Sequence, residues 1–158
     1  MTEAEKPAET PRMVVKAQYL RDSSFENLAV RSGDGRVEGK PEIQVAVNLD
    51  AKKRSETVYE VILKVTAKAN HGAAATFVVE IEYGGLFEVT GVPETQLHPM
   101  LLIEGPRLLF PFARRIVADL TRDGGYPPLM LDPVDFAALY RAEVERRRAA
   151  TAEPAGHA

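Results

Sequence analysis

The sequence predicts an α+β fold, in which a four-stranded antiparallel sheet carries helices packed on one face. Two observations predict this class. In the first part of the chain, apolar and polar residues alternate in several segments, which is typical of half-buried strands. In the second part, apolar residues recur at the three- and four-residue spacing of amphipathic helices. Strands followed by helices indicate an α+β protein.

Length and composition indicate one globular domain. The chain has 158 residues, of which 45% are hydrophobic and 27% are charged. We assign the domain to residues 13–148. Residues 1–12 and 149–158 are predicted to be disordered tails, because they are polar, contain proline and show no periodicity.

A β-hairpin is predicted for residues 57–83. Its odd-numbered positions are apolar from Tyr59 to Ala69 and again from Phe77 to Tyr83. Apolar residues must face apolar residues across the pair, because a slip of one residue would move them to the wrong face. A short loop centred on Gly72 then predicts a register. The pairs are Leu63 with Ile81, Val65 with Val79, and Lys64 with Glu80.

The even-numbered face of this hairpin is less polar than a solvated face should be. Ile62 and Val78 interrupt it, close to Glu80 and Glu82. Isolated apolar residues are common on protein surfaces. The alternative is an acidic and partly apolar docking face for a partner.

Two further strands are predicted before the hairpin, at residues 13–20 and 42–49. The first has apolar groups on both faces, as expected if both are covered, for example at a subunit contact. Residues 21–41 form a long irregular connection without a helical pattern. Residues 50–56 are predicted to be a solvated turn.

The end of the sheet and the first helices follow from glycine, proline and apolar spacing. Gly84 and Gly85 end the fourth strand, and residues 86–89 continue it after a bend or bulge. A short helix is predicted at 94–103. The main helix carries an apolar stripe over residues 108–120 and ends at Gly124-Gly125.

The last helix has a start signal. Asp132 is predicted as the N-cap, Pro133 as the first helical residue, and Asp135 as added negative charge in the first turn. Arginines near the end of this helix interact favourably with the partial negative charge of its C-terminus.

Composition excludes several functions. The net charge of −3 gives no support for nucleic-acid binding. The chain has no cysteine, no apolar signal segment and no apolar run long enough to insert in a membrane. A cytoplasmic location is the simplest expectation.

No catalytic constellation is recognisable. His71, His98 and His157 are far apart in the sequence and belong to no motif. Glu80 and Glu82 are placed on a polar face, whereas acid–base catalysis favours a dry pocket. We therefore predict that the protein is not an enzyme and needs no cofactor or metal.

Apolar side chains are numerous outside the strands, as at Phe25, Phe110, Met130 and Tyr126. They either complete the core or form a groove between sheet, loop and helix. A groove of this kind would bind extended apolar segments adaptably.

Several segments resemble the bacterial protein-export chaperone SecB family. They are YLRDSSFE (19–26), PEIQVAVNLDA (41–51), YEVILKVTA (59–67), TFVVEIEYGGLFEVTG (76–91) and GPRLLFPFARRIVADLTRDGGYPPLMLDPVDFAALY (105–140). The resemblance implies an ATP-independent holdase that binds non-native precursor proteins in apolar grooves and delivers them to the translocation ATPase SecA. It also implies a SecB-like sheet and a homotetramer built as a dimer of dimers.

The resemblance also implies two sets of site residues. The SecA-binding residues would be Asp22, Glu26, Val78 and Glu80. The client-binding groove would be lined by Ile43, Val45, Phe112, Leu129, Phe136 and Tyr140. No metal is expected, because the zinc of this partnership belongs to SecA.

The chain departs from the family pattern in three places. It lacks the aromatic residue usual before Pro41, residues 29–40 are divergent and glycine-rich, and the C-terminal end is more basic. Two alternatives to the general holdase also stay open. One is a SecB-like chaperone dedicated to a single client, such as a toxin–antitoxin pair, and the other is an α+β enzyme or small-ligand module.

Overall fold

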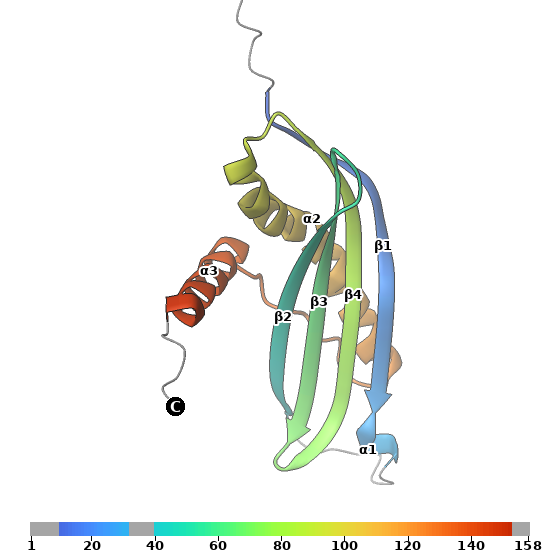
Figure 1. Ribbon diagram of the computed structural model, residues 1–158. Helices are drawn as coiled ribbons and strands as arrows, with labels where there is room; N and C mark the ends of the chain where they lie inside the picture. Colours follow the sequence, from blue (N-terminus) through green and yellow to red (C-terminus); the bar gives the residue numbers. More distant parts are fainter. Residues whose placement is uncertain (1–9, 32–39, 153–158) are drawn as a thin grey trace, which may run out of the picture.

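A four-stranded antiparallel sheet forms the body of the molecule, with strand order β1-β4-β3-β2 (Figure 1). The computed structural model describes residues 10–31 and 40–152. The strands are β1 (Arg12–Asn27), β2 (Glu42–Lys53), β3 (Val58–His71) and β4 (Ala74–Thr90). The central pair is the predicted hairpin, and β1 and β2 are the two edges.

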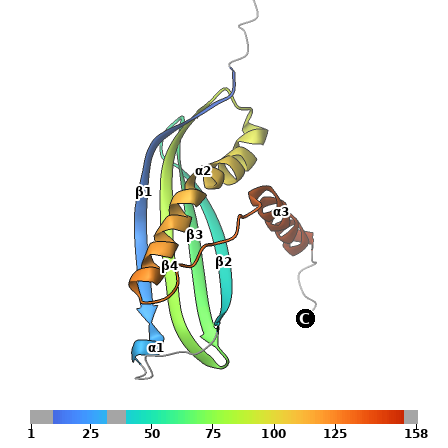
Figure 2. The same ribbon diagram turned by 180° about the vertical axis from the view of Figure 1, so that it is seen from behind.

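One face of this sheet is covered by the long helix, and the shorter helices lie at the end of β1 and beyond the β2 edge (Figures 1 and 2). The helices are α1 (Leu28–Arg31), α2 (Glu94–Asp123) and α3 (Phe136–Ala152). α2 crosses the sheet, and α3 packs against α2 and lies beyond the β2 edge. The predicted α+β class is confirmed.

The domain is slightly longer than predicted. β1 begins at Arg12, and α3 includes residues 149–152, all assigned to tails from the sequence. Residues 1–9 and 153–158 of those tails lie outside the described residues.

The core lies between α2 and the odd-numbered face of the hairpin, as the alternation predicts. Val61, Leu63 and Val65 of β3 are fully buried, and the odd positions of β4 from Phe77 to Val89 are buried with them. α2 contributes a stripe of four buried residues to this core. They are Leu101, Leu109, Ala113 and Val117.

The predicted hairpin register is wrong by one pair, although its parity is right. Leu63 lies opposite Tyr83, Val65 opposite Ile81, and Lys64 opposite Glu82.

The cause of this shift is a bulge in β4. The turn is at Gly72-Ala73, and pairing moves from Asn70–Ala75 to Ala69–Phe77, so that Thr76 is an extra residue. A two-residue turn alone would pair odd with even positions, and the bulge restores apolar-to-apolar pairing.

β1 is much longer than predicted. Residues 21–27, assigned to an irregular connection, continue β1, and residues 22–27 pair with residues 77–82 of β4. The pairing shifts between Val15 and Ala17 and again between Leu20 and Asp22. Each bulge interrupts the alternation of apolar and polar residues, so the sequence pattern does not reveal the full length of the strand. The rest of the connection is α1 and residues 32–39, which lie outside the described residues.

Two other strand ends were also misplaced. β2 continues through residues 50–53, which the sequence assigns to a turn. β4 runs through Gly84 and Gly85 without a shift in its pairing with β3, so the predicted continuation at residues 86–89 is confirmed, but the predicted end and bulge at these glycines are wrong. A Cβ on Gly84 would lie 2.9 Å from Cδ1 of Ile62, so glycine is needed for close packing.

α2 is one helix of 30 residues rather than the two predicted. Pro99, Pro106 and Pro111 lie inside it, where each removes a backbone donor and favours bending. Figure 2 shows the helix curving across the sheet.

The predicted end of α2 at Gly124-Gly125 is confirmed. Gly125 has a φ of 93°, its N–H donates to Arg122 O at 3.0 Å, and Tyr126 N–H donates to Thr121 O at 3.1 Å. This pattern is a Schellman cap.

α3 begins three residues later than predicted. Ala138 N–H donates to Asp135 Oδ1 at 3.0 Å, so Asp135 rather than Asp132 caps the helix. Asp132 and Pro133 belong to the extended loop between α2 and α3. Both aspartates are suitable caps, and only the packing of the loop chooses between them.

Candidate binding surfaces

The face of the sheet opposite α2 brings the four predicted SecA-binding residues together. Glu26 pairs with Val78, and Ser24, two residues from Asp22, pairs with Glu80. All four belong to the face that is not covered by helices, because their neighbours Val79 and Ile81 face the core. We call Asp22, Glu26, Val78, Glu80 and Glu82 the acidic sheet face.

Part of the acidic sheet face is neutralised within the chain. Lys64 Nζ lies 2.9 Å from Glu80 Oε1, and Arg21 Nε lies 3.7 Å from Glu82 Oε2. The hydrogen bond and the charge of Glu80 raise the pKa of Lys64. The predicted Lys64–Glu80 contact therefore exists as a diagonal ion pair, although Lys64 lies directly opposite Glu82.

Glu60 is a buried carboxylate that the sequence analysis missed. It is 6% exposed, accepts hydrogen bonds from Tyr19 Oη and Arg54 Nη2, and lies 3.8 Å from Arg21 Nη1. The Tyr19 hydrogen bond is the main cause that lowers the pKa of Glu60, and burial opposes it. Burial and the bond to Glu60 raise the pKa of Tyr19 to about 12.

This cluster also explains why Ile62 is buried. Tyr19 and Ile62 both lie against Gly84, so Tyr19 covers the even-numbered face at this point. No local signal marks Glu60, because its partners come from β1 and from the turn before β3. Only the pairing of distant strands brings them together.

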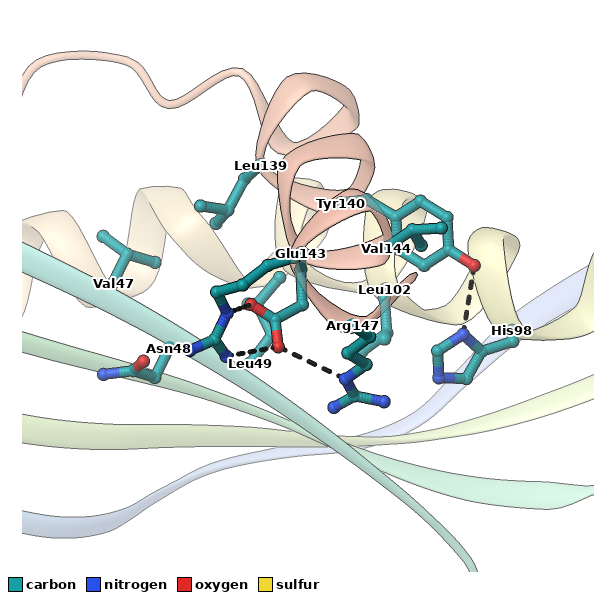
Figure 3. Close-up of a pocket in the computed structure, with 11 residues that line it drawn as sticks. Val47, Asn48, Leu49, His98, Leu102, Leu139, Tyr140, Glu143, Val144 and Arg147 are labelled. Atoms are coloured by element: carbon teal, nitrogen blue, oxygen red, sulfur yellow. Dashed lines mark hydrogen bonds and ion pairs between the residues drawn. The ribbon is translucent and has the colours of Figure 1, made fainter. Parts of the chain in front are cut away.

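A groove follows the β2 edge, between that strand, α2 and α3 (Figure 3). Two neighbouring pockets share Val47. The first is lined by Val47, Asn48, Leu49, His98, Leu102, Leu139, Tyr140, Glu143, Val144, Arg146 and Arg147. The second is lined by Val45, Val47, Phe110, Leu131, Asp132, Pro133 and Val134. We call the two together the edge groove.

The edge groove is largely apolar and partly open to solvent. Val45 of β2 lines the groove and is 48% exposed, and Ile43, two residues before it on the same face of β2, is 40% exposed. His98 Nδ1 lies 3.1 Å from Tyr140 Oη and joins α2 to α3. An uncovered apolar strip beside an edge strand is suited to holding an extended chain.

Three of the six predicted groove residues lie where a client could reach them along this groove. Val45 and Tyr140 line it, and Ile43 continues its exposed apolar surface. Leu129 is half-buried in the loop, where its N–H donates to Thr121 Oγ1 at 2.9 Å.

Phe136 and Phe112 do not lie in the groove. Phe136 is 1% exposed and packs edge-on against Phe110 at 5.9 Å, so it belongs to the core. Phe112 lies on the other side of α2, stacked 5.9 Å from Tyr83 of β4. Residues two apart on a helix point in nearly opposite directions, which separates Phe112 from Phe110.

A second apolar surface surrounds Phe112. Phe112, Leu108 and Leu20 are 45%, 44% and 45% exposed, and Leu20 pairs with Tyr83. We call these residues with Tyr83 the β1-side patch. Within the described part of the single chain, nothing fully covers the three exposed side chains, and the covering of β1 by a subunit stays a prediction.

In the part of the chain that the structure describes, the one buried carboxylate is Glu60. It lies outside both pockets and is held by hydrogen bonds. Within residues 10–31 and 40–152, no three His, Asp or Glu side chains are grouped to hold a metal ion. No helix there is long and apolar enough to span a membrane.

Comparison with known families decides the family. The model of the family described as "Preprotein translocase subunit SecB" matches residues 6–147. The chain belongs to the SecB family.

Curated SecB relatives match most of the chain. The protein-export protein SecB of Cereibacter sphaeroides is 60% identical over 140 residues, which cover 86% of this chain and 84% of that protein. The protein-export protein SecB of Roseobacter denitrificans is 51% identical over 154 residues, which cover 96% of this chain and 92% of that protein. A chaperone function in preprotein export follows from this membership.

A solved structure supports the SecB fold. The SecB-like chaperone of Mycobacterium tuberculosis, in complex with a peptide from the HigA1 antitoxin, has a TM-score of 0.63 and 16% identity. The match covers 78% of this chain and 91% of that one. At this identity the likeness concerns the fold alone.

Proposed function

We propose that the chain is an ATP-independent holdase that keeps non-native precursor proteins in the edge groove and delivers them to SecA in the cytoplasm. The observation that carries the client site is the uncovered apolar strip of Ile43 and Val45 beside the pockets. Many weak apolar contacts suit a chaperone, because each contributes about 25 cal/mol per Å² removed from water without selecting one sequence. The antitoxin peptide bound to the M. tuberculosis chaperone supports peptide binding by this fold.

Delivery to SecA is assigned to the acidic sheet face. Asp22 and Glu26 are exposed there, beside the half-buried Val78. Acidic groups around an apolar residue would steer a basic partner and make its binding sensitive to salt. Because this face and the edge groove are on different sides of the sheet, client and SecA would bind without competing for the same residues.

Assembly as a dimer of dimers is assigned to β1 and the β1-side patch. β1 is an edge strand with unpaired backbone groups, and Leu20, Leu108 and Phe112 lie beside it with exposed apolar area. Covering both features with further copies of the chain would remove an aggregation-prone surface.

A pair of lysine substitutions tests the separation of client and SecA binding. Val45→Lys places a charge in the groove, so it should abolish the protection of a denatured client from aggregation, measured by light scattering. Glu80→Lys should retain that protection and lose binding to SecA, measured by calorimetry. Each variant is the matched control of the other, because both residues are partly exposed on strands of one sheet.

Two results would contradict the proposal. If the unmodified chain fails to delay aggregation of any denatured client, it is not a holdase. If both variants lose client and SecA binding together, the two surfaces are not separate.

The single-client alternative is not favoured. The curated relatives at 51–60% identity are protein-export proteins, whereas the chaperone bound to an antitoxin peptide is only 16% identical. A competition assay between several unfolded precursors separates the two functions, because a general holdase exchanges one precursor for another.

A further inference from the structure

The end of the edge groove near α3 carries an excess of positive charge. Arg146 and Arg147 both line the first pocket, and Glu143 is the one carboxylate among its lining residues. Figure 3 shows Glu143 and Arg147 side by side over the β2 edge. Arg141 and Arg148 belong to the same helix and do not line the pocket.

Glu143 is already fully engaged by these arginines. Arg146 donates to it through Nη2 at 2.7 Å and Nε at 3.2 Å, and Arg147 donates through Nε at 3.3 Å. The hydrogen bond and charge of Arg146, followed by those of Arg147, lower the pKa of Glu143. One carboxylate cannot neutralise two guanidinium groups, so this end of the groove keeps about one positive charge.

The remainder of the first pocket is mostly apolar. Its apolar lining comes from all three elements that form it. These residues are Val47, Leu49, Leu102, Leu139 and Val144. A bound segment would therefore meet an apolar floor first and a cationic rim at one end. The one acidic residue of the second pocket, Asp132, lies towards the opposite end of the groove.

We propose that the edge groove selects client segments in which an acidic residue flanks an apolar stretch, with the client carboxylate bound by Arg146 and Arg147. The guanidinium groups have donors left over after Glu143 is satisfied, and a carboxylate matches their planar geometry. The side chains of Arg146 and Arg147 are 76% and 72% exposed, so the preference is moderate and depends on salt. This inference rests on the proposed holdase function.

Peptides with one apolar core and different flanking residues test this preference on the unmodified chain. The flanks are glutamate, glutamine or lysine, and affinity is measured by fluorescence anisotropy at low and high salt. We expect the glutamate peptide to bind roughly two- to fivefold more tightly than the glutamine peptide at low salt. The lysine peptide should bind most weakly, and high salt should reduce both differences.

Three variants assign the preference to the groove rim. Arg147→Gln should remove most of it, because the remaining arginine is neutralised by Glu143. Glu143→Gln should enlarge it, because both guanidinium groups are then free. Arg148→Gln is the matched control, since this arginine lies on α3 outside the pocket and its loss should leave the preference unchanged.

The outcomes separate this inference from the holdase function. Equal affinity for the glutamate and glutamine peptides, tighter binding of the lysine peptide, or an unchanged preference in Arg147→Gln would overturn the charge selection while the holdase function stands. If no peptide binds at either salt concentration, the holdase function fails and the selection fails with it.

Discussion

Glu60 is the residue whose environment departs furthest from its place in the sequence pattern. It occupies an even-numbered position of β3, on the face without helices, and is nevertheless buried. Removing a carboxylate from water is costly, and the hydrogen bonds from Tyr19 and Arg54 offset that cost. The cluster therefore links the edge strand β1 to β3 over β4, where Tyr19 lies against Gly84.

Replacing Glu60 should weaken the fold in a pH-dependent way. Glu60→Ala leaves Tyr19 and Arg54 without an acceptor, so the free energy of unfolding in urea should fall by about 1–3 kcal/mol near neutral pH. The folded-state pKa of Glu60 is lowered, so its stabilisation is present above the unfolded-state pKa and is lost as pH falls through the folded-state value. The variant and the unmodified chain should therefore become more similar in acid.

The same cluster predicts a loss of stability in alkali. The pKa of Tyr19 is raised to about 12, so stability in the unmodified chain should fall as pH rises from about 10 towards that value.

Glu88→Ala is a suitable control for Glu60→Ala, because the ion pair of Glu88 with Lys16 at 3.5 Å is partly exposed. If Glu60→Ala and Glu88→Ala lower the free energy of unfolding equally, the buried hydrogen bonds of Glu60 contribute no more than an exposed ion pair.

At the scale of the elements, the contact between α2 and β3 depends on Gly105. A Cβ at this position would lie 3.1 Å from Cγ2 and 3.2 Å from Cγ1 of Val61. These distances are tighter than ordinary van der Waals contact, so the helix and the strand approach as closely as they do because residue 105 has no side chain.

Gly105→Val should separate α2 from the sheet. We expect the free energy of unfolding to fall by about 1–3 kcal/mol, as is usual for an overpacked core. Adding Val61→Ala should recover part of the loss, because it removes the two methyl groups that the new side chain meets. If the two substitutions are additive in a double-mutant cycle, Val61 is not the residue that restricts position 105.

At the scale of the whole molecule, apolar surface remains exposed on both sides of α2. The edge groove faces β2, and the β1-side patch with Phe112 faces β1. We propose that the edge groove binds transient clients and that the β1-side patch contacts further copies of the chain, because a permanent contact must leave the client site free.

A lysine placed on the β1-side patch should change the assembly state, whereas a lysine placed in the edge groove should not. We expect native mass spectrometry to give a tetramer for the unmodified chain, and Phe112→Lys to give smaller assemblies with an unchanged circular dichroism spectrum. Val45→Lys should keep the tetramer and serves as the control. A monomeric unmodified chain, or a tetramer that survives Phe112→Lys, would exclude assembly through the β1-side patch.

Periodicity and local turn chemistry predicted much of this protein. They placed the hairpin, the buried odd-numbered face and the glycine end of α2, because each depends on residues close together in the sequence. The family resemblance added the predicted SecA-binding residues, whose role stays a prediction, and the pairing of β1 with β4 brings Glu26 beside Val78 on one face.

Tertiary structure decided what depends on distant elements. The bulge at Thr76 set the register, and two bulges concealed half of β1. Phe136 and Tyr140 share an apolar stripe in the sequence, yet α2 buries the first and leaves the second in the groove. An apolar pattern states that a side chain favours burial, but only the packing of other elements determines whether it is core or an open binding surface.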